Sequence, residues 1–214
     1  MYRERLTITL EPELLAAIDG MVDKQLLRNR SQTIEHLLKE GIGLHELRQA
    51  FLFFSEPADA AVLEQTVMFC ANNGISELLL GIPAGQTAQF ADMQAVARQA
   101  APTLQITHVP TDFGTGGALV LQRENLSHPF LILTLTPNLR LPSSILVAYA
   151  FHRQHHAPLT RLIREEPDGR YAPCGIEIAS PELLVSIPSG IASLSADVFP
   201  AMAKGGKVRS YVTA

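Results

Sequence analysis

A glycine-rich stretch, Gly114-Thr-Gly-Gly117, is a place where the backbone itself could bind a ligand. Glycines at the start of a helix allow a sharp turn and leave backbone N–H groups to face an anion or a nucleotide ring. The alternative is a tight connection between a strand and a helix, because one glycine-rich turn is a weak motif. We therefore expect Gly114, Thr115, Gly116 and Gly117 to form either a ligand loop or a close packing contact.

Other residues that could do chemistry lack the partners that the chemistry needs. His152, His155 and His156 have helical spacing, which could place two imidazoles on one face for a metal ion. No carboxylate or thiol supports them, so a solvated helix face is favoured and no metal site is predicted. The serines between residues 186 and 195 lack a Gly-x-Ser-x-Gly elbow, so no nucleophile is assigned.

Composition narrows the class of protein. The chain has 214 residues, of which 47% are hydrophobic and 18% charged, as expected for a globular protein with a core. Its two cysteines, Cys70 and Cys174, are too few for a disulfide framework. There is no apolar run of membrane-spanning length and no signal-peptide pattern, so a cytoplasmic protein is expected. The net charge of -4 gives no general attraction to nucleic acid.

The elements that must position these residues begin with a strand. Residues 5–10 alternate polar and apolar side chains, which predicts a strand with one apolar face. Its polar face carries Arg5, Thr7 and Thr9. Pro12 then suits the first turn of a helix, where its missing N–H costs nothing.

Two amphipathic helices are expected after this strand. The first runs from Pro12 to about Val22, and Ser31 is the predicted N-cap of the second, which weakens or ends at Gly41 and Gly43. So short a segment cannot bury its own apolar faces, and a single strand leaves its backbone edge unpaired. Both defects disappear if two chains pair their strands and intertwine their helices.

The segment from Arg3 to Leu47 resembles the Arc/MetJ/CopG-type ribbon-helix-helix family. The most specific element is Arg-Leu-Thr-Ile-Thr-Leu followed by Glu-Pro-Glu-Leu-Leu, and the Arg-Ser-Gln-Thr-Ile run fits as well. The resemblance implies a homodimer whose paired strands enter the major groove of double-stranded DNA. An ordinary edge strand with two helices, or a dimerisation arm that does not bind DNA, remain the alternatives.

The same resemblance implies roles for five residues. Arg5, Thr7 and Thr9 would read base edges from the strand, since arginine can bond bidentately to guanine and threonine offers a hydroxyl and a methyl. Ser31 and Gln32, at the start of the second helix, would hold a DNA phosphate through their backbone N–H groups.

The rest of the chain alternates apolar strand-like runs with helical patterns. This rhythm predicts a doubly wound, mostly parallel α/β sheet covered by helices. A joint near residues 43–49 would separate a domain of residues 1–48 from one of residues 50–214. The expected strands are 51–54, 77–81, 105–109 and 130–134, and the expected helices are 60–72, 89–99 and 116–124.

Several segments of this region resemble those of sugar-phosphate nucleotidyltransferases and stand in the same order. They include Gly114-Thr-Gly-Gly-Ala-Leu119, His128-Pro-Phe-Leu-Ile-Leu133 and Cys174-Gly-Ile-Glu-Ile178. The resemblance implies that the loop of residues 114–117 lies beside a bound nucleotide or sugar nucleotide.

Two departures from that family concern its chemistry. After Phe54 the chain has neither the glycine-rich loop nor the basic residues that hold a triphosphate in the family. The later strand ends in Leu133-Thr-Leu-Thr-Pro-Asn138, with hydroxyls where the family has a magnesium-binding aspartate. The sequence therefore predicts an inactive descendant, not an enzyme, with no catalytic residue and no cofactor.

Together these features predict a sequence-specific DNA-binding transcriptional regulator that acts as a dimer or higher oligomer. Its α/β domain would be a sensor or oligomerisation module, with a nucleotide or sugar nucleotide as effector. Two alternatives stay open. One is an active sugar-phosphate nucleotidyltransferase with an atypical site, and the other is an antitoxin-like autoregulator that binds a protein partner.

Overall fold

The computed structural model divides the chain into two compact units, Met1–Gly43 and Leu44–Ala214. It describes residues 7–22, 28–42, 47–54, 60–83, 85, 87–136 and 139–213.

The described part of the N-terminal unit contains two helices. The first, α1 (Pro12–Gly20), has Pro12 in its first turn, as predicted. The second, α2 (Arg30–Ile42), begins one residue before the predicted cap Ser31. The side chain of Asn29 accepts the backbone N–H of Gln32 at 3.0 Å, as an N-cap does, so the capping role predicted for Ser31 is wrong.

The two helices are tied together by an ion pair. Arg30 at the start of α2 donates from Nη2 to Asp19 Oδ2 at 2.6 Å, and both side chains are exposed. Residues 7–10 belong to no helix or strand of the single chain, and Arg5 lies outside the described residues. The predicted strand, which would need a second chain to pair with, stays a prediction.

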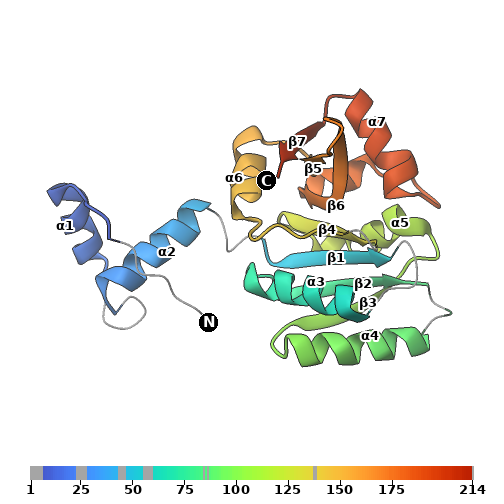
Figure 1. Ribbon diagram of the computed structural model, residues 1–214, viewed down its shortest axis with the longest axis horizontal. Helices are drawn as coiled ribbons and strands as arrows, with labels where there is room; N and C mark the ends of the chain where they lie inside the picture. The colour runs from blue at the N-terminus through green and yellow to red at the C-terminus, as the bar shows by residue number, and fades with distance from the viewer. Residues whose placement is uncertain are drawn as a thin grey trace. The chain divides into compact units, whose positions relative to one another are not determined.

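The second unit is built on a seven-stranded sheet with the order β3-β2-β1-β4-β6-β5-β7 (Figure 1). Among these strands only β6 runs antiparallel to its neighbours. The predicted mostly parallel α/β class is therefore confirmed for this unit. The strands are β1 (Gln49–Phe54), β2 (Glu77–Ile82), β3 (Gln105–Pro110), β4 (Phe130–Leu135), β5 (Leu159–Glu165), β6 (Tyr171–Ala179) and β7 (Val208–Val212).

The burial of each strand agrees with its place in the sheet. The central strands β1, β2 and β4 are near-continuous apolar runs, because helices cover both of their faces. The outer strands β3 and β7 are largely half-exposed or exposed, as expected for the edges of a sheet. The apolar pattern of each strand thus corresponds to its position in the sheet.

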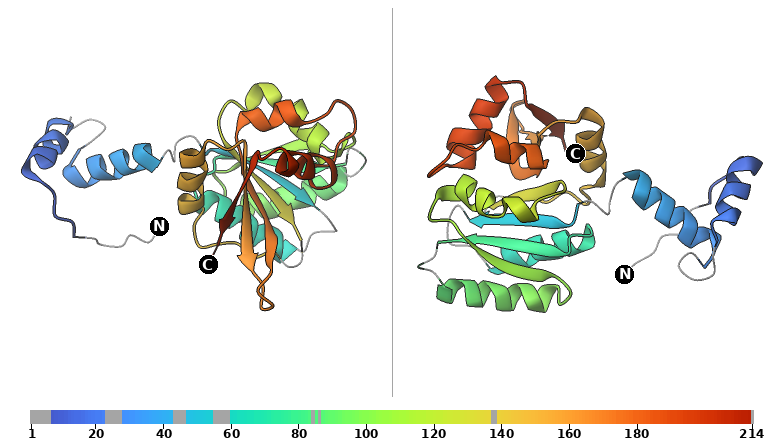
Figure 2. Two further views of the ribbon diagram at one scale, coloured as in Figure 1. Left: turned by 90° about the horizontal axis from the view of Figure 1, so that it is seen from above. Right: turned by 180° about the vertical axis from the view of Figure 1, so that it is seen from behind.

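Helices pack on both faces of the sheet and enclose two cores (Figure 2). The first core is covered by α3 (Ala60–Asn72), α4 (Thr87–Ala100) and α6 (Leu146–His155). The second core is covered by α5 (Gly114–Leu121), the 3-10 helix η3 (Pro181–Ser186), the π-helix η4 (Leu194–Val198) and α7 (Phe199–Lys204). A short 3-10 helix, η2 (Arg123–Asn125), follows α5.

Most of the predicted elements of this unit are present. The helix expected at residues 60–72 has those bounds as α3. A turn at Asp168-Gly169 joins β5 to β6 as a hairpin. The helix expected at 116–124 begins earlier, at Gly114, and ends in the 3-10 turn of η2. No helix among the described residues has both the length and the apolar character needed to cross a bilayer.

Candidate functional site

The carboxyl edge of the sheet is where a ligand site is expected. In open α/β sheets, ligands bind beyond the carboxyl ends of the parallel strands, above all where the strand order reverses. Here β2 and β3 follow β1 on one side, whereas β4 lies on the other side of β1. The reversal therefore falls between the ends of β1 and β4, at Phe54 and Leu135.

A glycine shapes the sheet beside this reversal. Gly175 on β6 has a φ of +74°, and a Cβ placed there would lie 3.0 Å from the carbonyl oxygen of Thr134. The register of β5 and β6 also shifts between Arg161 and Ile163. A residue other than glycine at position 175 would strain the backbone and press on the end of β4. Thr134 lies in the segment of residues 133–138, where the sequence has hydroxyls in place of the family's carboxylate.

Two adjoining hollows open at the carboxyl ends of β5 and β7. Their volumes are about 660 Å³ and about 620 Å³, within the usual range for small-ligand sites. Arg140, Arg164 and Glu165 line both hollows. Arg140 comes from the segment after β4, while Arg164 and Glu165 end β5, so the elements of the carboxyl edge bring these three charged side chains together.

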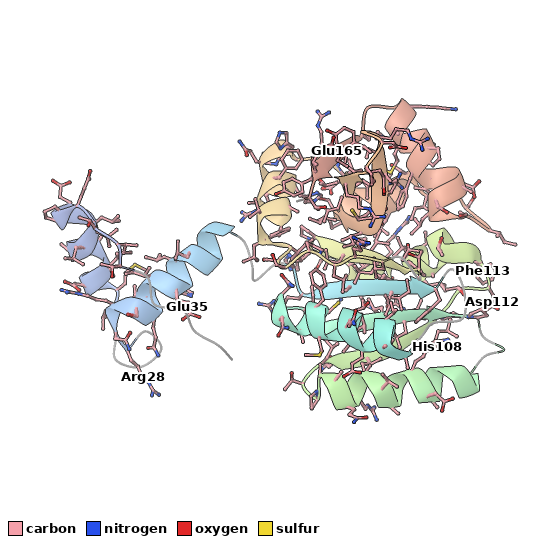
Figure 3. All side chains as sticks on the ribbon, viewed as in Figure 1. Arg28, Glu35, His108, Asp112, Phe113 and Glu165 are labelled. Atoms are coloured by element: carbon pink, nitrogen blue, oxygen red, sulfur yellow. The ribbon has the colours of Figure 1, made fainter. Side chains whose placement is uncertain are left out.

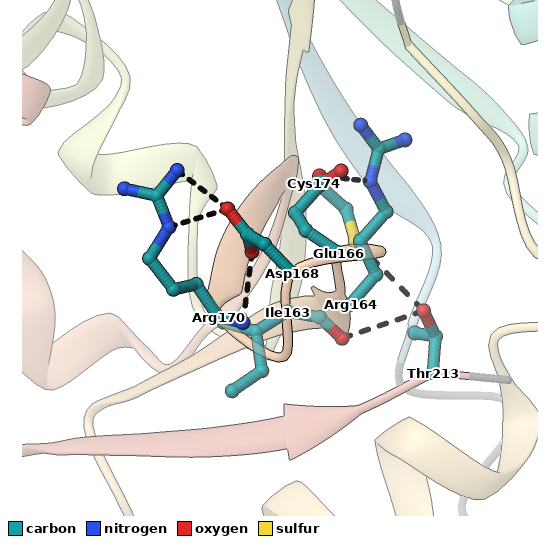
Figure 4. Close-up of polar contacts among 7 residues, drawn as sticks. All are labelled: Ile163, Arg164, Glu166, Asp168, Arg170, Cys174 and Thr213. Carbon is teal, nitrogen blue, oxygen red and sulfur yellow. Dashed lines mark hydrogen bonds and ion pairs between the residues drawn. The ribbon is translucent and has the colours of Figure 1, made fainter.

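The two arginines that line the hollow have N–H groups with no hydrogen-bond partner among the described residues. Arg164 donates from Nε to Glu166 Oε1 at 2.8 Å, and its other guanidinium nitrogens have no partner within the described chain (Figure 4). Arg140 has no hydrogen bond or ion pair with any described residue. A guanidinium group presents several N–H donors in a plane that matches the oxygens of a phosphate or carboxylate. The arrangement can therefore bind an oxyanion.

The wall of the second hollow includes Cys174. Its Sγ lies 3.8 Å from Thr213 Oγ1, and Thr213 Oγ1 in turn donates to the carbonyl oxygen of Ile163 at 3.4 Å (Figure 4). Burial, partly opposed by the hydrogen bond with Thr213, raises the pKa of the Cys174 thiol. The thiol is therefore neutral near pH 7 and poorly suited to act as a nucleophile.

The turn after these residues is held by its own ion pair. Arg170 donates to Asp168 from Nε at 2.7 Å and from its backbone N–H at 3.0 Å. These bonds lower the pKa of the Asp168 carboxyl, the side-chain bond most. Asp168 thus has a structural role in this turn, while Glu165 and Glu166 line the hollow.

The predicted loop of residues 114–117 lies at the start of α5. Gly114 has a φ of +75°, and a Cβ there would meet the carbonyl oxygen of Ala192 at 2.4 Å. The backbone N–H of Gly116 donates to that same oxygen at 2.9 Å, and the hydroxyl of Thr115 accepts the N–H of Leu194 at 2.9 Å. These contacts account for the glycines by close packing, and Gly117 is buried as well. Ligand binding by this loop stays a prediction.

Two exposed residues stand in front of this loop. Asp112 and Phe113 lie between β3 and α5, and Figure 3 shows both beside the start of α5. The Phe113 ring is 54% exposed, which is unusual for so large an apolar side chain. The glycine pattern indicated this part of the carboxyl edge but did not indicate the aromatic ring.

The residues predicted to contact DNA are described only in part. Thr7 and Thr9 are exposed, and Arg5 lies outside the described residues. Ser31 and Gln32 are exposed in the first turn of α2, where the backbone N–H of Gln32 is already bound by Asn29. Ser31 is thus the better placed of the two to offer a backbone donor to a phosphate.

His152 corrects the interpretation of the three histidines as a solvated helix face. It is 2% exposed, and its two ring nitrogens lie 2.8 Å from Thr160 Oγ1 and 2.8 Å from Ser180 Oγ. Burial lowers the pKa of His152 to about 4, so the ring is neutral. His156 ends α6 in the left-handed conformation. Among the described residues no group of three potential ligands could hold a metal ion.

Comparison with known proteins shows the fold. The chain is similar to a structure described as a putative glucose-1-phosphate thymidylyltransferase from Bacillus anthracis, in complex with sucrose. The TM-score is 0.61 at 10% identity, over 78% of this chain and 87% of that one. HddC from Yersinia pseudotuberculosis is also similar, with a TM-score of 0.54 at 11% identity, over 78% of this chain and 90% of that one. No protein-family profile and no curated protein sequence matches the chain.

The comparison overturns one prediction. The sequence predicted that the protein is not an enzyme and that its α/β domain is inactive. One of the solved structures that share its fold is described as a thymidylyltransferase, so this fold gives no ground for excluding an enzyme. The absence of a familiar glycine-rich loop after β1 was therefore not sufficient reason to exclude catalysis. The comparison gives no support to a role as a DNA-binding regulator.

Proposed function

We propose that the α/β unit is a nucleotidyltransferase that acts on a sugar phosphate. The observation that carries the proposal is the shared fold, which extends over nearly the whole of a thymidylyltransferase chain. The hollow at the carboxyl edge supports it, because Arg140 and Arg164 offer unpaired guanidinium donors where phosphate groups would lie. Catalysis of phosphoryl transfer consists mainly of positioning and charge stabilisation, which such donors provide.

In the proposed reaction, a phosphate oxygen of the sugar phosphate attacks the α-phosphorus of a nucleoside triphosphate. A new P–O bond forms, the bond between the α- and β-phosphates breaks, and pyrophosphate leaves. Arg140 and Arg164 would hold the negative phosphate groups in place. Glu165, whose carboxylate has no partner in the described chain, is the group that could ligate a magnesium ion together with substrate phosphates.

The proposal is tested by magnesium-dependent release of pyrophosphate. The full chain is incubated with each nucleoside triphosphate and a panel of sugar 1-phosphates. We expect release with at least one pair, and a loss of at least about tenfold in the Arg140→Gln and Arg164→Gln variants, since each removes charge-assisted hydrogen bonds. Arg98→Gln, which changes an exposed arginine of α4, is the matched control and should retain activity. Equal activity in all three variants would show that the hollow is not the site.

A second function is favoured by an observation in the N-terminal unit. Ile18 and Thr33 are the buried residues among residues 7–22 and 28–38, whereas Leu14, Met21 and Leu38 are 50%, 41% and 58% exposed. We propose that a second copy of the chain covers these apolar side chains, and that the paired units bind double-stranded DNA through Arg5, Thr7 and Thr9. A nucleotide or sugar nucleotide bound to the α/β units would then influence DNA binding.

Binding to the DNA upstream of the protein's own gene tests this second function. Fluorescence anisotropy should show site-specific binding that weakens as salt is added and that is lost in Arg5→Ala. A folded, dimeric protein that binds no DNA would leave the N-terminal unit as a dimerisation arm. Co-purification with another protein in a stable complex would instead favour the antitoxin-like alternative.

A further inference from the structure

Arg161 on β5 lies apart from the hollow described above. It is three residues from Arg164 on the same strand, so the two side chains point to opposite faces of the sheet. The neighbouring apolar residues agree, since Leu162 belongs to the core under α6 and Leu159 to the core under α7. Arg161 therefore belongs to the face that α7 covers, and the proposed nucleotidyl transfer does not use it.

The Arg161 guanidinium is held in position by two contacts. Its Nε donates to Glu177 Oε1 at 3.2 Å, and its central carbon lies 4.8 Å from the centre of the Phe199 ring. The side chain of Arg161 is 26% exposed while that of Glu177 is 4% exposed. Solvent therefore reaches the Arg161 side chain but hardly reaches the Glu177 carboxylate. An arginine fixed through Nε and stacked on an aromatic ring loses little further freedom when it binds a ligand.

Both members of the pair have unused bonding capacity. The terminal nitrogens of Arg161 have no partner among the described residues, and Glu177 Oε2 is buried without a hydrogen bond. Buried polar atoms in folded proteins nearly always have a partner, so an unpartnered one calls for an explanation. A proton on Glu177 would reduce the cost of burying this carboxylate and would leave the charge of Arg161 uncompensated.

A hydroxyl residue lies opposite Arg161 on the neighbouring strand β7. Ser210 on β7 is the register partner of Arg161, so the two side chains share a face of the sheet, and Ser210 is exposed. Of the charged residues on the covering elements, Glu182 of η3 is exposed, Asp197 of η4 accepts the backbone N–H of Ser193, and Lys204 is exposed at the end of α7. β4 contributes only Ile132 beside Glu177. Arg161 is therefore the charge that acts directly on Glu177.

We propose that Arg161 and Ser210 bind a small oxyanion, of the sulfate or phosphate monoester class, and that the anion binds together with a proton on Glu177. The terminal N–H groups of Arg161 donate to the anion, and the Ser210 hydroxyl donates a further bond. A second negative charge beside Glu177 favours the protonated carboxyl, so each binding event promotes the other.

The electrostatics of Glu177 agree with this coupling. Burial raises the pKa of the Glu177 carboxyl to about 7, although Arg161 opposes the rise. The group therefore changes its protonation within the physiological range. If the anion requires the protonated form, the apparent affinity falls about tenfold between pH 6 and pH 8, because the protonated fraction falls by that factor.

Sulfate is the probe of choice because its charge does not change between pH 6 and pH 8. Binding is followed by NMR of the arginine Nε–Hε signals, with the Arg161 signal assigned by its absence in Arg161→Lys. We expect sulfate to shift that signal about tenfold more tightly at pH 6 than at pH 8. In Glu177→Gln, whose amide is always neutral, binding should be independent of pH and as tight as wild type at pH 6.

Three controls keep the test decisive. Ser210→Ala, a substitution on an exposed edge strand, should weaken sulfate binding several-fold without affecting folding. Arg140→Gln should leave the Arg161 signal and its response unchanged, because the hollow lies on the other face. A parallel titration with glucose 1-phosphate identifies the source of the anion: tighter binding than sulfate assigns an ester, and equal or weaker binding assigns an inorganic anion.

No shift of the Arg161 signal with either anion would overturn the proposal. So would an unchanged pH dependence in Glu177→Gln with the protein folded. Neither result depends on nucleotidyl transfer, so this inference and the proposed function can fail separately.

Discussion

In the N-terminal unit, Ile18 is the one buried apolar side chain among residues 7–22 and 28–38, and Leu14, Met21, Leu37 and Leu38 are exposed. The α/β unit, in contrast, encloses two apolar cores, one on each face of its sheet. Both segments have apolar residues at helical or strand spacing. The difference shows that such a pattern identifies the face to be buried but does not say whether the same chain supplies the cover. We infer that the α/β unit folds by itself and that the N-terminal unit depends on a partner.

The largest effect is expected in the core of the α/β unit. Phe130 is fully buried on the central strand β4 and contacts Phe51, with ring centroids 6.0 Å apart. Phe130→Ala should lower the free energy of unfolding by about 3–5 kcal/mol, through lost apolar burial and the cavity left behind. Urea unfolding measures the change. Val185→Ala, at a position 84% exposed, should change it by less than about 0.5 kcal/mol. A change near zero in Phe130→Ala would contradict the self-contained core.

The next effect is expected in the association of two chains. Leu38→Asp places a charge on the exposed apolar surface of α2 and should raise the dissociation constant of the dimer at least about 30-fold, as for an interface hot spot. Sedimentation analysis measures the change. Val147→Asp alters a side chain of the α/β unit that is 66% exposed, and it should leave association unchanged. If the Leu38 variant remains as dimeric as wild type, another surface joins the chains.

Acid should weaken the α/β unit through His152. Its pKa lies at about 4 in the folded protein, below the value of about 6.5 in an unfolded chain, so protonation favours unfolding. The contribution of neutral His152 is complete above pH 6.5 and is lost as the pH falls towards 4. At pH 5 the loss is about 2 kcal/mol.

Glu177 acts in the opposite direction over an overlapping range. Its raised pKa means that its stabilising contribution is complete below about pH 4.3 and is lost as the pH rises through 7. The two effects partly cancel in the wild type, so the variants His152→Gln and Glu177→Gln must be compared. Between pH 8 and pH 5 the free energy of unfolding should increase towards acid in His152→Gln, where only Glu177 titrates, and decrease in Glu177→Gln, where only His152 titrates. Parallel profiles for wild type and His152→Gln would refute the buried neutral ring.

The smallest effects compare two glycines, one from each unit. Gly74 follows α3 and has a φ of +83°, whereas Gly20 ends α1 and has no positive φ. At both positions a Cβ could be added without meeting another atom within 4 Å. Gly74→Ala should destabilise the α/β unit by about 1 kcal/mol because of its left-handed backbone. Gly20→Ala should stabilise the N-terminal unit by about 0.5 kcal/mol because it restricts the unfolded chain. If thermal unfolding showed that both substitutions stabilise, or that both destabilise, the difference in φ between the two glycines would be contradicted.

The sequence predicted local features well and long-range ones poorly. Helix α3 and the parallel sheet could be predicted because their signals, apolar runs and helical spacing, lie within single segments. The cap of α2 was placed two residues late because Asn29 and Ser31 are both good caps, and only the structure shows which one bonds.

The charged hollow could not be predicted in the same way. Arg140 and Arg164 lie far apart in the sequence and meet because β4 and β5 end at the same edge of the sheet. His152 was misinterpreted for the same reason, since its partners Thr160 and Ser180 belong to other elements. A search for basic residues just after each predicted parallel strand would have found Arg140.

The most direct test of the proposed enzyme is ³¹P NMR of the full chain with magnesium, a nucleoside triphosphate and glucose 1-phosphate. The account predicts that the signals of a diphosphate diester and of pyrophosphate grow in equal amounts, and that Arg140→Gln suppresses both while Arg98→Gln does not. Unchanged spectra with every nucleoside triphosphate and sugar phosphate, from a folded protein, would contradict it. So would hydrolysis to orthophosphate alone.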